Sequence, residues 1–400
     1  MARSIETSGF PLGFRAAGDA LYKWPKAEAE GIVPIRCLAG ALQAMQKEAL
    51  VHNGASGETW YLTCDEGPYL NGTDLAPFPL AFFTAGLAAS YLADIAGLAS
   101  AHGTALRRLE LVQDNRYTME GSALQGTMIG GALPVELEVT ADAYTDNTAL
   151  RDLVNQAVAA SPATALLATH LSSRFSLVRN GAQAPIAEVG ALDGAPLPRP
   201  QAALEGARPV EPADYAPDII AKLKGAETVE GEGGAGSSLQ AEQKRTLHVR
   251  GHGRIRDDGL QEITIQLFKP IGSSFRILSD SARPAGERGR APTGLELMSA
   301  GIAFCFLTQL GRYAHIVKQP LDHYSVVQDT RFILPGAFAG TAEAAEAAPV
   351  ESHVHIDAPA ELPAVQRLVA MGERTCFLHA ACRGGVETHI RLTRPGEAAA

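Results

Sequence analysis

The feature that most constrains the fold of this chain is an internal repeat at a fixed spacing. Residues 112–117 read V-Q-D-N-R-Y, and residues 327–332 read V-Q-D-T-R-F, an offset of 215 residues (327 − 112). The same offset aligns further positions of the two segments: Trp60 with Phe275, Asp65 with Asp280, Pro77 with Pro292, Ser90 with Cys305 and Ser161 with Cys376. One register held over so much of the chain predicts a duplicated unit.

The repeat divides the 400 residues into two copies and a connection. We expect a first repeat at 32–181, a linker at 182–244 and a second repeat at 245–396. A hydrophobic content of 46% is sufficient for two cores. The linker is rich in Gly, Pro, Ala and Glu, which bury little apolar area, and residues 216–225 are its one candidate for a short docked helix.

Both copies show the same order of predicted elements. In the first copy these are strands at 49–52 and 59–63, a long helix from Pro77 to about Gly103, strands at 109–113 and 135–140, a helix at 147–161 and a strand at 175–178. The second copy repeats them at 246–249, 263–267, from Leu295, 324–333, 350–356, 362–376 and 387–392. Strands, a helix, strands and a helix predict an α+β unit with antiparallel sheet.

Charge and composition argue against several classes of partner. The formal net charge of −10 disfavours nucleic acid and anionic membrane surfaces. The chain opens without an apolar stretch after positive charge, so we expect no secretory signal and a cytoplasmic location. The apolar segments 79–99 and 294–314 contain Asp94, Glu296 and Arg312, which favours buried helices over membrane spans.

Five cysteines, an odd number, make a structural disulfide framework improbable and leave individual thiols to be explained. Cys305 falls on the apolar face of its predicted helix, and Cys376 falls at the end of the next helix. Both can be inert core thiols, because free cysteine is among the most buried residue types. Both can also form a reactive pair, because the first copy carries serine at the two positions.

A family resemblance favours the reactive pair. Residues 291–306, A-P-T-G-L-E-L-M-S-A-G-I-A-F-C-F, resemble the helix of the OsmC/Ohr family that carries the reactive cysteine, and Cys376 matches the family's second cysteine. The resemblance implies two OsmC-like repeats, each with antiparallel sheet and long central helices. It also implies that they form an intramolecular pseudo-dimer, with one thiol site and one serine-substituted remnant at Ser90 and Ser161.

The resemblance further implies thiol-dependent reduction of organic hydroperoxides, a peroxiredoxin-like peroxidase activity. Cys305 would attack the peroxide and Cys376 would resolve the sulfenic acid. The partners would be a small lipophilic substrate and an external thiol or dithiol, with no cofactor and no metal. Family members hold the thiolate with a Glu and an Arg. Here Leu295 stands at the Glu position, so Glu296 is the nearest candidate.

The arginine has several candidates. Arg331 belongs to the repeated hexapeptide, as does Arg116, and both can instead form ion pairs with Asp329 and Asp114. Arg250, Arg254 and Arg256 on an early strand are the other candidates.

Two other functions stay open. One is a non-redox enzyme that uses Cys305 as a nucleophile on an electrophilic metabolite, and the other is a non-catalytic pseudo-dimer that binds a small ligand or a protein. The C-x2-H-x2-C run of Cys376, His379 and Cys382 does not converge on a tetrahedral ion, so no metal is expected. His353 and His355 share one strand face and are expected at the surface. Whether the tandem chain dimerises further is left open.

Overall fold

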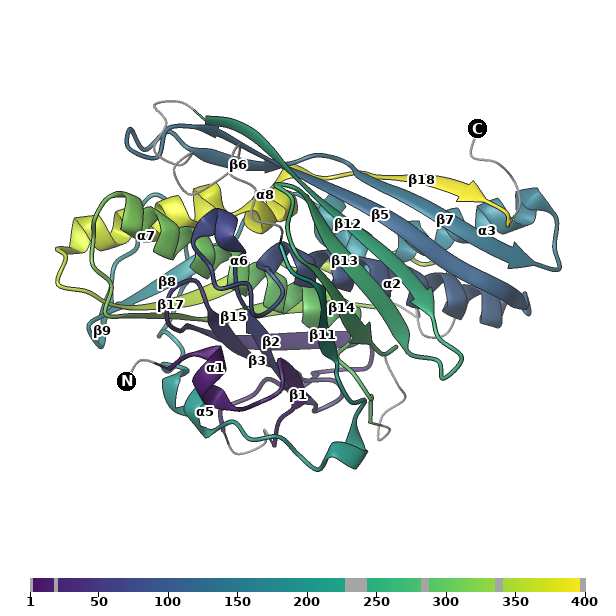
Figure 1. The fold of residues 1–400 in the computed structure, drawn as a ribbon, viewed down its shortest axis with the longest axis horizontal. Coiled ribbons are helices and arrows are strands. Elements are labelled where there is room, and N and C mark those ends of the chain that lie inside the picture. The colour runs from purple at the N-terminus through teal and green to yellow at the C-terminus, as the bar shows by residue number, and fades with distance from the viewer. Residues whose placement is uncertain (1–2, 18–20, 227–242, 282–287, 335–340, 396–400) are drawn as a thin grey trace.

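The computed structural model describes residues 3–17, 21–226, 243–281, 288–334 and 341–395. It is an α+β fold in which two sheets enclose two long helices (Figure 1). The fold class expected from the sequence is therefore confirmed. The glycine-rich part of the expected linker, 227–242, lies outside the described residues, as does residue 396 at the end of the second repeat.

The first sheet combines strands from both ends of the chain. Its order is β1 (Gly13–Arg15), β4 (Thr59–Cys64), β3 (Lys47–Asn53), β2 (Ile32–Ala41), β15 (His323–Ile333), β17 (Glu351–Asp357), β8 (Arg174–Arg179) and β10 (Gly190–Ala191). Two short strands pair beside this path, β9 (Ala182–Ala184) with β8 and β16 (Glu346–Ala347) with β15.

The second sheet has the same plan. Its order is β11 (Ile220–Lys224), β14 (Ser274–Ser279), β13 (Gln261–Lys269), β12 (Gln243–Ile255), β5 (Leu106–Gly121), β7 (Val135–Ala143) and β18 (Thr388–Thr393), with β6 (Ile129–Ala132) paired to β5. We call residues up to 226 the first half and residues from 243 the second half. Each sheet then contains early strands of one half beside late strands of the other half.

The helices repeat the sequence offset. The long helices α2 (Pro79–Ala101) and α6 (Gly294–Ile316) begin and end 215 residues apart, as do α3 (Asn147–Ala160) and α7 (Leu362–Thr375). The remaining helices are α1 (Ile5–Ser8), α4 (Pro162–Ala168), α5 (Gln201–Gly206) and α8 (Phe377–Gly384), with 3-10 turns η1 (Pro68–Leu70) and η2 (Pro212–Asp214).

The two long helices lie between the sheets and pack against each other (Figure 1). Helix α6 packs on β2, β3 and β15 of the first sheet, and α2 packs on β5, β12 and β13 of the second. A Cβ added at Gly86 of α2 would lie 2.5 Å from the carbonyl oxygen of Gly294 on α6, so glycine allows this close approach. Both helices are long and apolar enough to span a membrane by length and composition, and both are largely buried in the molecule.

The sheets are antiparallel except at one end of each. β8 pairs parallel with β17 and with β10, and β18 pairs parallel with β7. The sequence pattern predicted only antiparallel pairs because it treated each repeat alone. The β8–β17 and β18–β7 pairs join the closing strand of one half to a strand of the other half, and β8–β10 joins two strands of the first half.

The outer face of the first sheet carries a second, smaller core. Leu38, Leu50, Tyr61 and Val327 of the sheet are covered by Phe14 and by Leu204 of α5. The N-terminal segment and residues from about 185 to 215 therefore form a packed cover, where the composition predicted a linker. His353 and His355 of β17, expected at the surface, are buried (6% and 3% exposed).

The prediction of a helix at residues 216–225 is wrong. The segment docks as an edge strand, β11, which pairs with β14 so that Ile220 faces Ile277. Pairing with the open edge of the sheet outweighs the helix propensity of the A-K-L-K sequence.

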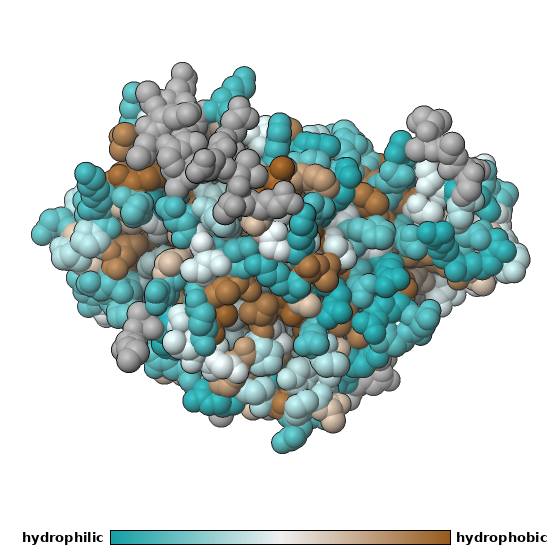
Figure 2. Space-filling view, in the orientation of Figure 1, coloured by the Kyte–Doolittle hydropathy of each residue, from teal (hydrophilic) through white to brown (hydrophobic). Residues whose placement is uncertain are grey.

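The face drawn in Figure 2 is mostly hydrophilic, with an apolar group near its centre, which fits an interior that holds both long helices.

Candidate active site

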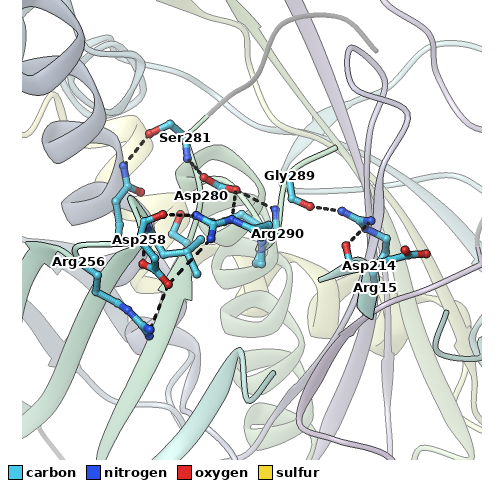
Figure 3. A network of polar contacts seen from close by, with 12 residues as sticks. Arg15, Asp214, Arg256, Asp258, Asp280, Ser281, Gly289 and Arg290 are labelled. Carbon is cyan, nitrogen blue, oxygen red and sulfur yellow. Dashed lines mark hydrogen bonds and ion pairs between the residues drawn. The ribbon is translucent and has the colours of Figure 1, made fainter. Parts of the chain in front are cut away.

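Cys305 lies in the middle of α6 and is 2% exposed. The helix starts at a capping box, in which the Glu296 carboxylate accepts the backbone N–H of Thr293. The segment before this start is fixed by a polar network (Figure 3). Arg15 binds the carbonyl of Gly289, and Asp280 accepts the backbone N–H of Arg290 at 2.8 Å. Contacts from both halves therefore set the position of α6.

Cys376 lies at the break between α7 and α8. It has extended backbone angles (φ −71°, ψ 116°) and is the N-cap residue of α8. The backbone N–H groups of Leu378 and His379 point to its sulfur and lower its pKa, but burial raises the pKa by more. Ser161, at the corresponding position of the first half, is likewise the N-cap of α4 and accepts the N–H of Ala163 at 3.2 Å.

The two cysteines come together. The Cys376 thiol lies in hydrogen-bonding reach of the Cys305 sulfur, and both are free thiols. Burial raises the pKa of Cys376 well above its ordinary value, and the neighbouring Cys305 raises it further. Cys376 therefore keeps its proton at neutral pH.

A histidine touches the second thiol. His379 Nδ1 lies 3.2 Å from Cys376 Sγ, and its ring packs against Phe175 and Phe306. Burial lowers the pKa of His379 to about 4, so the imidazole is neutral at physiological pH. It can exchange a hydrogen bond with the thiol but does not supply a positive charge to a thiolate.

Residues of the first half complete the site. Cys64, the last residue of β4, and the buried hydroxyl of Tyr117 on β5 both lie close enough to Cys305 for its charge to raise their pKa values. Glu66 accepts a hydrogen bond at 3.1 Å from Thr308, which follows Cys305 by one turn of α6. Lys47, paired with Cys64 across the strands, lowers the pKa values of both Cys64 and Glu66.

None of these four first-half residues was selected from the sequence. A signal was present, because the 215-residue offset pairs Cys64 with Ser279 and Glu66 with Ser281. At these two positions the second copy carries the serine, whereas at Cys305 the first copy carries it. The exchange of strands between the halves explains this reversal, because it brings first-half residues to the second-half thiols. The site is therefore built from thiols of the second half and from strand residues of the first half.

The two charged residues predicted to hold the Cys305 thiolate lie elsewhere. Arg331 points outward from β15 and forms an ion pair with Glu28 at 2.9 Å. Glu296 is nine residues before Cys305, about 13.5 Å along a helix that rises 1.5 Å per residue, and it caps the helix instead. Burial raises the pKa of Glu296 to about 8, so this carboxyl is largely protonated at neutral pH.

The other arginines considered also have carboxylate partners at the surface. Arg116 lies 4.0 Å from Asp114, as the ion-pair interpretation predicted. Arg250 binds Asp114 at 2.8 Å, Arg254 binds Glu262 at 2.7 Å and Arg256 binds Asp258 at 3.1 Å. They form a surface network on the second sheet.

The serine positions of the first half contain no thiol. Ser90 is buried opposite the start of α6, where a Cβ at Gly294 would lie 2.9 Å from the Ser90 nitrogen. Ser161 lies near Asp94, whose pKa burial raises to about 7. Since a hydroxyl is far less acidic than a thiol and forms no disulfide, this site cannot carry out the chemistry open to the cysteines.

Comparison with known proteins identifies the segment that carries the thiols. A family model described as "OsmC-like protein" matches residues 286–391. Residues 286–391 are an OsmC-like domain. The match includes Cys305, Cys376 and His379, but not Cys64, Glu66 or Tyr117 of the first half.

One solved structure is also similar, an OsmC-like hydroperoxide resistance protein from Jannaschia sp. CCS1. The alignment has 22% sequence identity, covers 32% of this chain and 79% of that chain, and has a TM-score of 0.19. Comparison with curated proteins found no match.

Proposed function

We propose that this chain is a thiol-dependent reductase of organic hydroperoxides, with Cys305 as the attacking residue and Cys376 as the resolving residue. The observation that carries the proposal is the contact of these two free thiols inside the OsmC-like domain. Two neighbouring buried thiols, an attacking one and a resolving one, are what a two-cysteine peroxidase needs.

The reaction has two steps. The Cys305 thiolate attacks the terminal oxygen of the hydroperoxide, the O–O bond breaks, and the products are a sulfenic acid on Cys305 and an alkoxide that takes a proton to leave as the alcohol. The Cys376 thiol then attacks the sulfenic sulfur, which forms the Cys305–Cys376 disulfide and releases water. An external dithiol reduces this disulfide by thiol–disulfide exchange and is itself oxidised.

The surroundings suggest roles for first-half residues. Burial raises the pKa of the Tyr117 hydroxyl and the Cys305 charge raises it further, so this hydroxyl keeps its proton near the thiols and would serve as a hydrogen-bond donor for a thiolate. Burial raises the pKa of Cys64, and the Lys47 cation offsets part of that rise, while Glu66 accepts a hydrogen bond from Thr308, one turn after Cys305. They take the place of the Glu and Arg that the resemblance implied. The apolar packing around Cys305 supports a lipophilic substrate.

The test is a titration of the reduced protein with less than one equivalent of cumene hydroperoxide, followed by peptide mass spectrometry. We expect a Cys305–Cys376 disulfide, peroxide consumption at the background rate in Cys305→Ser, and a trapped sulfenic acid in Cys376→Ser. Cys37→Ser, which removes a buried thiol of β2, is the matched control and should behave as the parent.

Unchanged peroxide consumption in Cys305→Ser would refute the proposal. A single covalent adduct on Cys305, formed equally well in Cys376→Ser, would favour the non-redox enzyme, in which Cys305 attacks an electrophilic metabolite. Absence of any turnover would favour a ligand-binding pseudo-dimer.

A further inference from the structure

A pocket of about 730 Å³ opens beside the C-terminal end of α6. Its apolar wall comes from Met45 at the β2–β3 turn, Leu70 of η1, Ala314 and Ile316 of α6, and Leu321 after the helix. A volume of this size is typical of small-molecule sites, which lie between about 300 and 1,000 Å³. The pocket is therefore large enough for a ligand with an apolar body.

The charged residues in the lining of this pocket, Arg312 and Lys318, are both cations. Arg312, His315 and Lys318 line it, and no Asp or Glu is among its described lining residues. Arg312 is 7% exposed. Burial and the nearby Arg245 cation together lower its pKa to about 9, against the opposing effect of the Glu66 carboxylate, so Arg312 still carries its charge at neutral pH. A buried guanidinium at an apolar wall favours a negatively charged ligand group.

The related pocket of the first half is different. It lies at the end of α2, and its lining residues Ala96, Gly103 and Leu109 correspond by the 215-residue offset to Gly311, Lys318 and Tyr324. There the lining itself includes a carboxylate, Glu110, which Arg108 binds at 2.9 Å, and Arg254 binds Glu262 at 2.7 Å. The offset places Gly97 where the other pocket has Arg312, so the buried cation belongs to the second pocket alone.

Arg312 also shares a helix face with the thiol site. Cys305, Thr308 and Arg312 are spaced i, i+3 and i+7, and Arg312 lies about 10 Å from Cys305 along the helix axis at 1.5 Å per residue. Glu66, which accepts from Thr308, also accepts from Tyr69 at 2.6 Å, and Tyr69 directly precedes Leu70 of the pocket wall. A continuous set of contacts thus joins the pocket wall to the surroundings of Cys305.

We propose that the pocket at the end of α6 binds an amphiphilic anion, a carboxylate or phosphate monoester on an apolar chain. The anionic group pairs with the Arg312 guanidinium, which can donate two parallel hydrogen bonds to either group. The chain lies against Met45, Leu70 and Leu321. Lys318 at the mouth adds a second, exposed cation.

This binding does not depend on thiol chemistry, so it can be tested apart from the proposed function. Isothermal titration would compare decanoate, decyl phosphate and decanol, which share one chain length. We expect one or both anions to bind, and decanol to bind at least about 10-fold more weakly because it forms no charge-assisted hydrogen bond. The two anions distinguish a carboxylate ligand from a phosphate ligand.

Variants locate the site. Arg312→Gln should weaken the anion by about 10-fold or more, and Lys318→Asn, which tolerates the positive φ of 55° at this position, should weaken it less. Leu321→Trp, which fills the pocket from a loop, should block binding and serves if Arg312→Gln fails to fold. Arg254→Gln in the related pocket and Cys305→Ser should leave binding unchanged.

The proposal is overturned if neither anion binds, if decanol binds as tightly as the anions, or if Leu321→Trp and Lys318→Asn both leave the affinity unchanged. Anion binding by the parent protein together with absent peroxide turnover by the same protein would retain the pocket and reject the proposed function, so the two failures can be told apart.

Discussion

A single atom distinguishes the two N-cap residues at Ser161 and Cys376. Serine is a favoured N-cap residue, and its oxygen accepts the Ala163 N–H at 3.2 Å. Cysteine is not among the favoured N-cap residues, so its presence at the start of α8 is poorly explained by helix stability. Burial raises the pKa of this sulfur, and the amide groups at the helix end offset part of that rise, which eases the loss of the thiol proton when the sulfur attacks a sulfenic acid.

Glu296 gives a prediction about pH. Its pKa of about 8 in the fold lies above the ordinary value of 4.5, so between these values the folded protein holds a proton that the unfolded chain releases. The free energy of unfolding should therefore fall as pH rises through this window, by up to about 1.4 kcal/mol per pH unit. Glu296→Gln keeps the capping box and should remove this dependence.

Urea unfolding at pH 5, 6.5 and 8 measures the effect. Glu120→Gln, at an exposed carboxylate of β5, is the control and should keep the parental pH dependence. An equal loss of stability with pH in Glu296→Gln and in the parent would show that another group is responsible.

Among the residues of the site, the sequence could predict those that are cysteine in the second copy and serine in the first. Cys305 and Cys376 stand against serines, and the structure brings them together. Glu66 and Tyr117 could not be assigned to the same site, because each repeat was considered with its own strands. Glu296 was placed near the thiol by sequence proximity alone, although nine helical residues separate them by about 13.5 Å.

At the scale of elements, the crossing of α2 and α6 depends on small residues. A methyl group added at Gly86 on α2 would lie closer than 3 Å to both the Gly294 carbonyl and the Met298 side chain of α6. Gly97 belongs to the same helix and has open space around it. The two glycines therefore separate the effect of packing from that of helix propensity.

We expect Gly86→Ala to destabilise the protein by about 1–3 kcal/mol, because the added methyl group forces the helices apart. Gly97→Ala should instead stabilise it by about 0.5–1 kcal/mol, because alanine is the better helix former. Thermal unfolding followed by circular dichroism at 222 nm compares the two. A melting temperature that rises in both variants would contradict this expectation, because it would mean that α2 and α6 can move apart at the crossing with little loss of stability.

Elements with strong periodicity were predicted within a few residues, such as α3 and α7 with their apolar stripes. The errors fall where a weak local pattern meets a strong tertiary contact. Residues 216–225 have helix-forming side chains, but the edge of β14 takes them as a strand. The expected linker contains few apolar residues, yet Leu204 and Leu197 pack against the outer face of the first sheet, which no local pattern reveals.

At the scale of the whole molecule, the two halves exchange strands. The first-half strand β2 pairs with β15, and the second-half strand β12 pairs with β5 along most of its length. These two pairings lie in the middle of the sheets, so each sheet is incomplete without strands of both halves. The thiol site depends on the same exchange, because Cys64, Glu66 and Tyr117 reach α6 only through it.

Separation of the halves should therefore abolish folding. We expect fragments 1–226 and 243–400, produced singly, to be aggregated or unfolded, because each would expose the central edges of both sheets and one face of a long apolar helix. Co-expressed, they should associate into a 1:1 complex with the circular dichroism spectrum of the full chain and a single cooperative unfolding transition. A fragment that alone is monomeric, cooperatively folded and protected from hydrogen exchange would contradict the mutual dependence of the halves. If the complex forms, the Cys305–Cys376 disulfide after peroxide treatment should appear in the complex and not in fragment 243–400 alone, since the strand residues that surround the thiols come from the other fragment.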